Sequence, residues 1–549
     1  MSDSGIVEQL RGNKRFSVLF AEEKAKRTDA EFCSILDKVE DLIRNKGPAF
    51  DLAAKVQETT IPQIFDGYDV MARAQTGAGK TLAFAIGMVA KVNRSNSNIQ
   101  AICFSPTHEL VTQTKNVIAS LVQGMTPEIR VVDTSITSTE IWKSMTKDTL
   151  PHIVVSTAGG LSSKLKNLTG GLKNKWARDL KRSILGNVKL LVLDEADDMI
   201  MDSKNGITTT ELPLLKKDYG LNFEQVVCYS ATYNSESERQ IKAICRRTDG
   251  RKLQILELPY AISPAIKQIV IKIKSEKNKN ATLQRKMEAL KDIYRNNVVQ
   301  KSIIFMNKKH DDEKPVPGDA SIDSISAEIE NLSNRAAGLD YVCRHFYKGM
   351  KDPLNPSDNS ADQNEYRRKV FANFCKPKGQ EGAFDVVVTS DVMARGIDLP
   401  EINLVVNFDL PMTRDRHAVE PITYIHRIGR CSRFGKIGTA VTFIEEGSTG
   451  FDGIKEYCTN HLIPGKSCAF NYDEIIGEEK IGERVSTLIT EFKSRGAAVI
   501  EQEAKLEFVV REDDGSAATA ADASATVFDS TVDAIAGDLS KATIGGAAV

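Results

Sequence analysis

The residues best suited to chemistry form a short run rich in glycine and ending in lysine and threonine: Ala74-Gln75-Thr76-Gly77-Ala78-Gly79-Lys80-Thr81. Glycines let backbone N–H groups wrap phosphate oxygens, the lysine reaches β- and γ-phosphates, and the Thr81 hydroxyl is placed for Mg²⁺. A strand-like segment (70–72) precedes the run and a helix-forming segment (82–86) follows it. This context favours a phosphate-binding loop over the alternative, a turn with an ordinary helix cap.

Two adjacent carboxylates, Asp194 and Glu195, end an apolar segment within the sequence LLVLDEAD (190–197). An enzyme with such a loop needs an acid at a strand end to hold Mg²⁺ and a second group to position the attacking water. Asp194 suits the metal together with Thr81, and Glu195 suits the water. Acids at strand ends are usually just solvated, but their conjunction with the loop predicts phosphoryl chemistry.

Three arginines at a spacing of three residues, Arg427, Arg430 and Arg433, lie in the sequence TYIHRIGRCSR (423–433). On a helix they would share one face. A guanidinium there can stabilise charge on a transferring γ-phosphoryl group. The alternative is a basic helix that is only solvated or that contacts RNA phosphate.

The elements that must position these residues are short β-branched segments separated by stretches long enough for a helix. They lie at 101–104, 153–155, 190–193, 226–229, 303–305, 386–388 and 404–406. This rhythm predicts an α/β fold with parallel sheets, and polar residues after almost every segment are where such folds place a site. Four segments precede residue 233 and three follow residue 300, so we predict two domains joined near 257–268.

Composition excludes several classes of protein. The chain has 549 residues, 73 Lys+Arg against 74 Asp+Glu and 41% hydrophobic residues, which excludes collagenous and membrane-spanning chains. Its formal charge of -1 leaves nucleic-acid binding to a local site. Nine scattered cysteines without a C-x-x-C pair indicate reduced thiols. With no signal sequence in the first residues, we expect a cytoplasmic or nuclear location.

In this order, these motifs resemble the DEAD-box family of ATP-dependent RNA helicases, from Phe32 to about Ile476. The resemblance implies two tandem RecA-like domains that use ATP and Mg²⁺. It also implies that Gln57 reads the adenine edge, that Phe32 packs on the base and that Asp398 meets the ribose. Arg430 and Arg433 would then meet the γ-phosphate.

The resemblance further assigns coupling and RNA-contacting roles. Hydrolysis would be coupled to strand separation by a set of polar residues from both domains: Ser230, Ala231, Thr232, Asp197 and His426. RNA would be contacted through its backbone, without sequence preference, by a second set: Pro106, Thr107, His108, Glu109, Thr157, Gly159, Thr389, Arg395 and Gly396. The implied protein is a monomer that binds single-stranded RNA or a short duplex.

Details narrow the resemblance to the branch that exports mRNA at the cytoplasmic side of the nuclear pore. His108 stands where the family usually has arginine, and an extra segment (412–421) precedes the motif HRIGR. That branch implies a nucleoporin and an export activator with inositol hexakisphosphate as partners, and no membrane. We expect an N-terminal extension (1–30), a first domain (31–258), a second domain (259–480) and a C-terminal extension (481–549) that is disordered after about residue 512.

Most departures from the family pattern lie in the motifs to which the resemblance assigns RNA contacts, rather than in those for ATP. Ala158 stands where the family's RNA-backbone motif T-P-G has proline. Gln363 and Arg367 are one position further apart than the glutamine and arginine of the family's Q-x-x-R element. Polar segments at 311–323 and 352–363 indicate loop insertions. Three functions therefore stay open: an RNA helicase that remodels mRNA–protein complexes, an ATP-gated RNA clamp with little unwinding, and an unrelated P-loop enzyme acting on DNA or protein.

Overall fold

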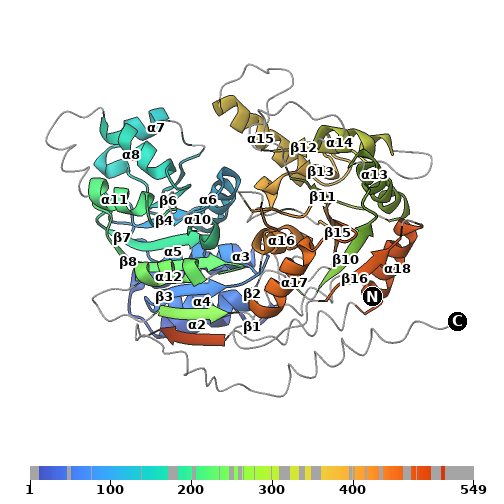
Figure 1. Ribbon diagram of the computed structural model, residues 1–549. Helices are drawn as coiled ribbons and strands as arrows, with labels where there is room; N and C mark the ends of the chain where they lie inside the picture. Colours follow the sequence, from blue (N-terminus) through green and yellow to red (C-terminus); the bar gives the residue numbers. More distant parts are fainter. Residues whose placement is uncertain are drawn as a thin grey trace.

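The structure is a computed structural model that describes residues 11–513 with gaps. The gaps comprise residues 46–50, 76, 136, 138, 171–183, 201–205, 234, 246–252, 258–261, 264, 277–278, 298, 308–321, 333–340, 348–359, 395–398, 400–401, 414–416, 432–436, 462–470, 478 and 496–508. The predicted tail after residue 513 therefore lies outside the described residues. Figure 1 shows two α/β domains side by side.

The first domain is built on an eight-stranded sheet that is parallel except at one edge. In spatial order its strands are β17 (Val509–Asp513), β9 (Leu253–Glu257), β3 (Asp69–Arg73), β8 (Phe223–Ser230), β7 (Val188–Asp194), β4 (Ala101–Phe104), β6 (Ile153–Ser156) and β5 (Val131–Asp133). β17 pairs antiparallel with β9. The central strands β4, β6 and β7 are mostly apolar because helices cover both faces of the sheet.

The second domain has a seven-stranded sheet in which every pair is parallel. Its spatial order is β12 (Cys343–Phe346), β13 (Val386–Thr389), β11 (Ser302–Phe305), β14 (Leu404–Asn407), β15 (Gly438–Glu445), β10 (Ile266–Ile273) and β16 (Asp473–Ile476). The chain therefore passes from the first sheet to the second between Glu257 and Ile266.

Each sheet separates two hydrophobic cores, as alternation along a strand requires. In β7, Leu190 and Val192 lie in one core and Leu191 and Leu193 in the other. The helices of the first domain are α3 (Ala30–Arg44), α4 (Lys55–Phe65), α5 (Lys80–Ala90), α6 (His108–Val122), α7 (Thr139–Ser144), α8 (Gly160–Gly170), α10 (Ala196–Ile200), α11 (Glu211–Tyr219) and α12 (Ser235–Cys245). Those of the second are α13 (Lys279–Asn296), α14 (Ile322–Asn331), α15 (Ser360–Cys375), α16 (Pro421–Ile428), α17 (Gly450–His461) and α18 (Ile481–Ser494).

The described residues before Ala30, from Arg11 onward, pack against the first domain. β1 (Arg11–Arg15) pairs with β2 (Leu52–Ala54). The helix α2 (Phe16–Ala25) buries Phe16, Leu19 and Phe20 in the core that also holds Phe84. Burying three large side chains is worth several kcal/mol, of order 1.5–3 kcal/mol each. The described part of the N-terminal extension is thus packed against the domain.

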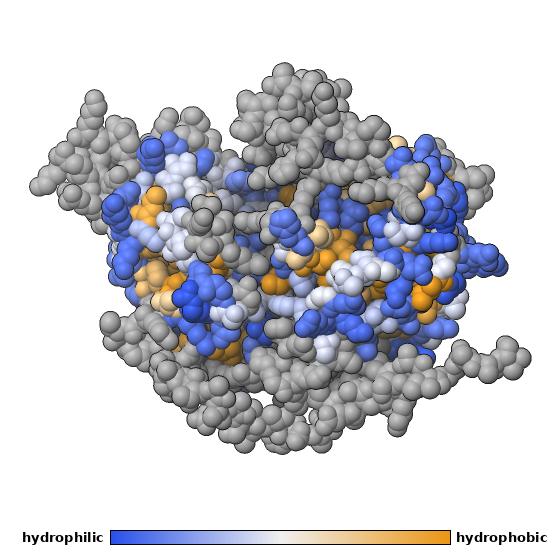
Figure 2. Space-filling view, in the orientation of Figure 1, coloured by the Kyte–Doolittle hydropathy of each residue, from blue (hydrophilic) through white to orange (hydrophobic). Residues whose placement is uncertain are grey.

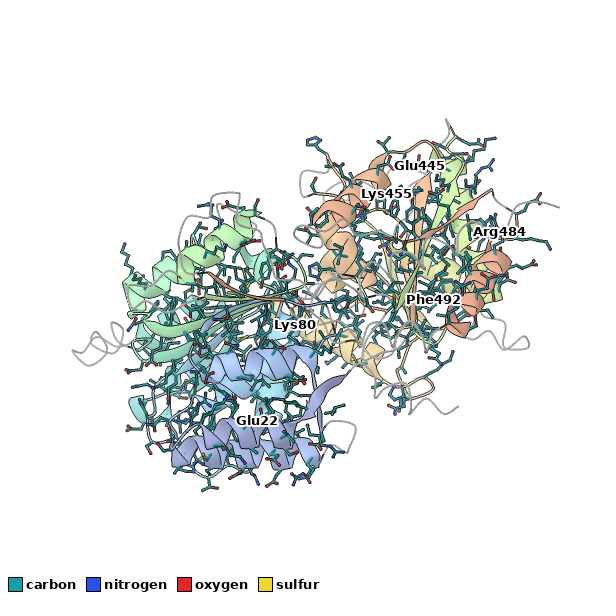
Figure 3. The ribbon with its side chains drawn as sticks, turned by 90° about the horizontal axis from the view of Figure 1, so that it is seen from below. Glu22, Lys80, Glu445, Lys455, Arg484 and Phe492 are labelled. Atoms are coloured by element: carbon teal, nitrogen blue, oxygen red, sulfur yellow. The ribbon has the colours of Figure 1, made fainter. Side chains whose placement is uncertain are left out.

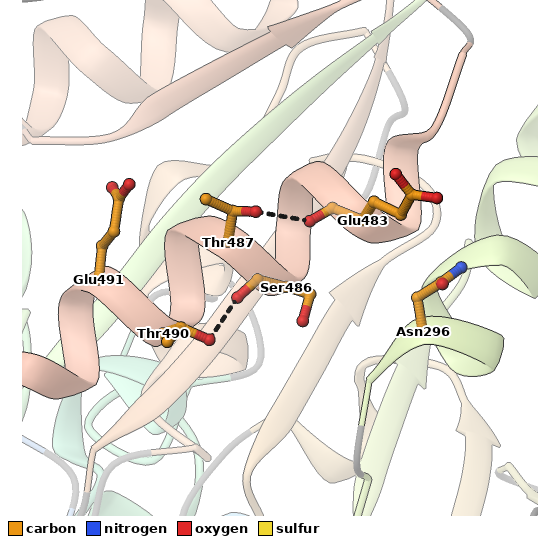
Figure 4. Close-up of a pocket in the computed structure, with 6 residues that line it drawn as sticks. All are labelled: Asn296, Glu483, Ser486, Thr487, Thr490 and Glu491. Atoms are coloured by element: carbon orange, nitrogen blue, oxygen red, sulfur yellow. Dashed lines mark hydrogen bonds between the residues drawn. The ribbon is translucent and has the colours of Figure 1, made fainter.

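The surface in Figure 2 is mostly hydrophilic in that view, with hydrophobic residues showing between the polar ones. In the part of the chain that the structure describes, no helix is long and apolar enough to cross a membrane. A pocket of about 370 Å³ lies on α18, lined by hydroxyl and carboxylate side chains and by Asn296 (Figure 4). Thr487 and Thr490 turn their hydroxyls onto the helix backbone there.

Every strand predicted from an apolar segment is a strand in the structure, which confirms the α/β architecture. Three local expectations were wrong. Residues 322–323 begin α14 rather than ending a loop. Residues 360–363 begin α15 rather than ending a loop, because Ser360 and Asp362 are typical of a helix start. Arg427 and Arg430 do not share one helix face, because α16 ends at Ile428 before the poor helix former Gly429.

Candidate active site

The glycine-rich loop joins β3 to α5, as predicted. Gly77 and Gly79 have φ angles of 82° and 92°, a region that favours glycine. A Cβ atom at Gly79 would lie 2.6 Å from Gln57 Nε2. That amide group donates to the carbonyl oxygen of Gly79 at 3.0 Å, and Gln57 Oε1 accepts from Ala54 N–H at 2.7 Å. Gln57 therefore braces the loop from α4. Thr76 lies outside the described residues.

The two acids at the end of β7 lie against the loop lysine. Lys80 Nζ is 3.5 Å from Glu195 Oε1, and Lys80, Asp194 and Glu195 are all buried. Figure 3 places Lys80 on the side of the first domain that faces the second. The arrangement gathers one cation and two carboxylates where the γ-phosphate end of a nucleotide in this loop would lie.

A histidine of the second domain completes this cluster. His426 of α16 is fully buried, with Nε2 at 3.5 Å from Asp197 Oδ2 and Nδ1 at 3.9 Å from Glu195 Oε2. Asp197 also accepts hydrogen bonds from Ser230 and, at 2.9 Å, from Thr232 Oγ1. Thr232 Oγ1 lies 3.4 Å from His426 Nε2. Four of the five predicted coupling residues, all except Ala231, thus meet in one buried network between the domains.

Burial and neighbouring charges set the protonation of the two acids. Burial, reinforced by the charge of Glu195, raises the pKa of Asp194 to about 7. Burial opposes ionisation of Glu195 as well. Lys80, His426 and Arg430 outweigh it, however, and hold the pKa of that carboxyl below its usual value. Glu195 is therefore ionised at neutral pH, which a group that orients and activates water requires.

The donor atoms fit a magnesium–nucleotide complex. Thr81 and Asp194 offer a hydroxyl and a carboxylate, the hard oxygen ligands that Mg²⁺ prefers. Two buried polar atoms of the same cluster, Glu195 Oε2 and His426 Nδ1, have no hydrogen-bond partner in the described protein. Buried groups of this kind are normally satisfied, so they indicate a place for water or substrate oxygen.

Phe32, expected to pack on adenine, is only 8% exposed. Its ring packs nearly perpendicular to that of Phe65, with centroids 5.0 Å apart, and the Arg27 guanidinium lies 5.2 Å from the Phe32 centroid. Arg27 is held there by Glu23 and Asp66. Little ring surface is left for a base. Sequence reasoning missed Arg27, because no spacing rule relates it to Phe32.

The arginines of the second domain take different positions. Arg427 is fully buried, bonds Asp391 at 2.6 Å and the Asp409 carbonyl oxygen at 2.7 Å, and covers the ring of Phe305. It therefore braces the second domain. Arg430 is buried and donates to the carbonyl oxygen of His426 at 3.1 Å. Arg433, like Asp398, lies outside the described residues.

Of the residues predicted to contact RNA, some face solvent and others do not. Pro106, Thr107, His108, Thr157 and Gly159 are exposed or partly exposed, and Arg395 and Gly396 lie outside the described residues. Thr389 is buried and its hydroxyl donates to the Phe346 carbonyl oxygen at 2.6 Å. Glu109 is 7% exposed and accepts from Arg367 Nη2 at 2.7 Å.

The ion pair of Glu109 with Arg367 is a second contact between the two domains, in addition to that of His426 with the acids. Arg367 comes from α15 and also covers the ring of Phe346, at 5.3 Å. The shifted spacing of Gln363 and Arg367 hid this contact from sequence reasoning. The partner of Arg367 is 258 positions away and only the fold brings it close.

Two family models match the chain in succession. One, described as DEAD/DEAH box helicase, matches residues 54–241, and the other, helicase conserved C-terminal domain, matches residues 285–435. Together they cover the loop, the paired acids, His426 and Arg430.

Curated relatives and solved structures agree with these matches. The ATP-dependent RNA helicase DBP5 of Meyerozyma guilliermondii is 30% identical over 401 residues, which are 72% of this chain and 69% of the relative. Its counterpart from Eremothecium gossypii is 29% identical, covering 72% and 71%. A structure of S. cerevisiae Dbp5 bound to RNA and ADP BeF3 has 24% identity and a TM-score of 0.57, covering 84% of this chain and 97% of its own.

Proposed function

Since this chain belongs to the DEAD-box family of ATP-dependent RNA helicases, which hydrolyse ATP, we propose that it remodels mRNA–protein complexes during export from the nucleus. The observation that carries the catalytic part of the proposal is the buried contact of His426 with Asp197 and Glu195. Catalytic acids on one domain meet a histidine on the other, so hydrolysis depends on how the domains sit together.

In the proposed reaction each residue has a defined task. Lys80 places positive charge at the phosphates, and ionised Glu195 accepts a hydrogen bond from the attacking water. Mg²⁺, held by Thr81 and Asp194, would neutralise phosphate charge. Arg430 and Arg433 would add charge from the second domain. We propose the bounds 31–258 and 259–480 for the domains that bring these groups together.

Coupling to RNA follows from the network around Asp197. Ser230 and Thr232 bind Asp197 from within the first domain, while His426 reaches it from the second. Opening of the domains would remove His426 from both acids. RNA bound across both domains would favour closure and so stimulate hydrolysis, and loss of the γ-phosphate would release the RNA.

The proposed activity is tested by measuring ATP hydrolysis of the full chain with RNA, with DNA and with neither. We expect stimulation by RNA alone. Lys80→Ala and Glu195→Gln should lower the stimulated rate by at least about 10²-fold, since each removes charge from the reacting centre. Turnover that is independent of RNA would contradict the proposal.

One observation favours a second candidate, an ATP-gated RNA clamp with weak unwinding. Two side chains expected to contact RNA, Glu109 and Thr389, are buried and bonded to protein groups instead. A clamp would bind RNA tightly with a non-hydrolysable ATP analogue yet leave a short duplex intact. A strand-displacement assay beside the binding assay separates the two functions.

The export role rests on the relatives. Matching proteins are named DBP5, and in one solved structure a variant of S. cerevisiae Dbp5 is bound to a variant of Gle1 and to IP6, at 23% identity to this chain and a TM-score of 0.56. By this likeness we propose an export activator with inositol hexakisphosphate as a partner. From the resemblance to the export branch we also propose a nucleoporin, at the cytoplasmic face of the pore. Imaging of the tagged chain tests the location, and absence from the nuclear rim would contradict it.

A further inference from the structure

The described N-terminal segment, residues 11–27, packs against α4, the helix that carries Gln57. We call this segment the strap. It consists of β1, α2 and the two residues that follow α2. Figure 1 shows these elements together with α4 and β2 at the lower end of the first domain. The family model that matches this domain begins at residue 54, so the strap lies outside the part of the chain that the model covers.

Gln57 ties the first turn of α4 to its surroundings through both ends of its amide group. Its Oε1 atom accepts from Ala54 N–H, and its Nε2 atom donates to the Gly79 carbonyl oxygen. An amide group has two lone pairs on oxygen and two N–H bonds, so one of each stays available for a ligand. This pair matches adenine, which presents a donor at N6 beside an acceptor at N7.

The position of α4 decides where that amide group points, and the structure leaves α4 little room to move. A Cβ atom at Gly79 would lie 2.6 Å from Gln57 Nε2, and one at Gly87 of α5 would lie 2.6 Å from Ile64 Cγ2. The helix is thus packed closely against the loop and against α5. Because hydrogen bonds weaken steeply with angle, a small tilt of α4 would cost the Gln57 amide its alignment with a base.

The strap holds the residues that lead into α4. β1 pairs antiparallel with β2, with Arg15 opposite Leu52, and Phe16 N–H donates to the Asp51 carbonyl oxygen at 2.8 Å. The ion pair of Arg15 with Asp51 adds little, because the Arg15 side chain is 68% exposed. A two-stranded sheet such as β1–β2 is marginal by itself, so this attachment depends on the packing of α2.

Arg27 holds the other end of α4. It bonds two carboxylates, that of Glu23 in α2 and that of Asp66, the residue directly after α4. Its guanidinium carbon also lies 5.7 Å from the ring centroid of Phe65, the last residue of α4. The Glu23 side chain is 1% exposed, and its second cation, Lys26, is half exposed. A buried carboxylate needs a cation close by, so Arg27 is required at this place.

Between the two attachments, α2 and α4 contribute apolar side chains to one core: Phe16, Leu19, Phe20, Val56, Ile61 and Ile64. At about 1.5 Å per residue, the 11 residues of α4 span roughly 16 Å. The strap therefore restrains α4 before its first residue, along its length and after its last residue.

We propose that the strap is a positioning element of the nucleotide site, and that Arg27 is the positioning residue through which it sets the angle of α4 and of Gln57. This inference rests on the proposed function, in which Gln57 reads adenine. Guanine presents an acceptor, O6, where adenine presents its N6 donor. An amide group held at a fixed angle rejects the base that leaves it unpaired, so loosening α4 should lower the preference for adenine over guanine.

The test measures binding of ADP and of GDP, each with Mg²⁺, to the full chain by titration calorimetry. Arg27→Ala removes the bond to Asp66, whereas Asp66→Asn removes only the charge on the α4 side. The matched control is Arg44→Ala at the last residue of α3, which removes an arginine that pairs with a carboxylate four residues earlier. Gln57→Ala gives the reference in which the preference is lost.

In Arg27→Ala we expect the ADP dissociation constant to rise about fivefold, as for the loss of one net hydrogen bond, and that of GDP to change less than about twofold. Asp66→Asn should shift the preference in the same direction by a smaller factor, and it decides the question if Arg27→Ala does not fold. Arg44→Ala should leave the preference unchanged. In a Gln57→Ala background, Arg27→Ala should no longer alter the ratio of the two constants, because it acts through Gln57.

Equal weakening of ADP and GDP binding, which a general loss of structure produces, would overturn the inference. So would an unaltered preference in Arg27→Ala and Asp66→Asn, or a full adenine preference in Gln57→Ala. An unmodified chain without a preference for ADP would overturn it as well. Absence of RNA-stimulated ATPase in the unmodified chain would instead contradict the proposed function, and the binding data would still decide on the strap.

Discussion

Glu195 has a φ angle of 50°, in the left-handed region that residues with a Cβ atom seldom occupy. A non-glycine residue held there costs of order 1–3 kcal/mol, and such strain gathers at functional sites. Here it turns the side chain from the end of β7 toward Lys80 and His426. The backbone that follows Asp194 thus aims two adjacent acids at different partners, which gives them different pKa values.

A second buried side chain predicts how stability depends on pH. Burial, with a smaller effect of Arg130, lowers the pKa of His152 to about 4, and its Nδ1 atom accepts from Arg130 N–H at 3.0 Å. The unfolded chain takes up the proton near pH 6.5, before the folded one does. The neutral His152 ring therefore makes its full contribution to the free energy of unfolding above pH 6.5, and this contribution is lost as the pH falls toward 4.

We expect the free energy of unfolding to fall by about 2 kcal/mol more between pH 7 and pH 5 in the unmodified chain than in His152→Gln. Urea titrations at the two pH values measure this difference. His417→Gln, at an exposed position, serves as the control and should keep the full pH dependence. An identical pH dependence in His152→Gln would contradict this account.

At the scale of elements, helix ends and glycines decide how α18 docks. A Cβ atom at Gly482 would lie 2.2 Å from the Asp292 carbonyl oxygen and 2.6 Å from Asn296 Nδ2. The helix therefore approaches α13 as closely as only glycine permits. The same turn carries Ile481 and Val485 into the core, so the contact fixes both the position and the direction of α18.

Gly482→Val should destabilise the second domain by about 1–3 kcal/mol, because α18 or α13 must shift. Thermal unfolding measures the loss. The matched change Gly453→Ala lies in α17, where a Cβ atom meets nothing within 4 Å. We expect that control to leave the melting temperature unchanged or to raise it slightly. Equal effects of the two substitutions would show that close packing is not the cause.

At the scale of the molecule, closure brings buried charges of the two domains together. Arg367 and Glu109 form such a pair, and the His426 ring lies close by in the same interface, with Nε2 at 3.5 Å from Asp197 Oδ2. Removing one partner of a buried pair leaves the other without compensation, which is costlier than removing both. These contacts therefore make closure depend on a few buried polar residues.

Arg367→Ala should make the free energy of domain closure less favourable by at most about 3–5 kcal/mol. The RNA concentration for half-maximal ATPase should rise at least about tenfold. The neighbouring Arg368→Ala, at a partly exposed position, is the control and should have a small effect. ATPase titrations with RNA measure both. Combining Arg367→Ala with Glu109→Gln should cost less than the separate effects added, and strict additivity would argue against the pairing.

The sequence by itself determined the phosphate-binding loop, the paired acids and about half of the strands of the two sheets, because each of these depends on residues close together in the chain. Glycine spacing, an apolar segment and the acids at its end are local patterns. The family resemblance added Gln57 and His426 to these locally predicted residues. The distances between all these side chains depend on the tertiary structure.

Only the tertiary structure decided which distant groups meet. It placed Arg367 on Glu109, His426 on Asp197 and β17 on β9, at separations of 258, 229 and more than 250 residues. It also buried Phe32 and Thr389, to which the family resemblance had assigned contacts with the base and with RNA. Such pairings depend on how two sheets pack and close, and no local pattern of residue types encodes the distance between surfaces that fold separately.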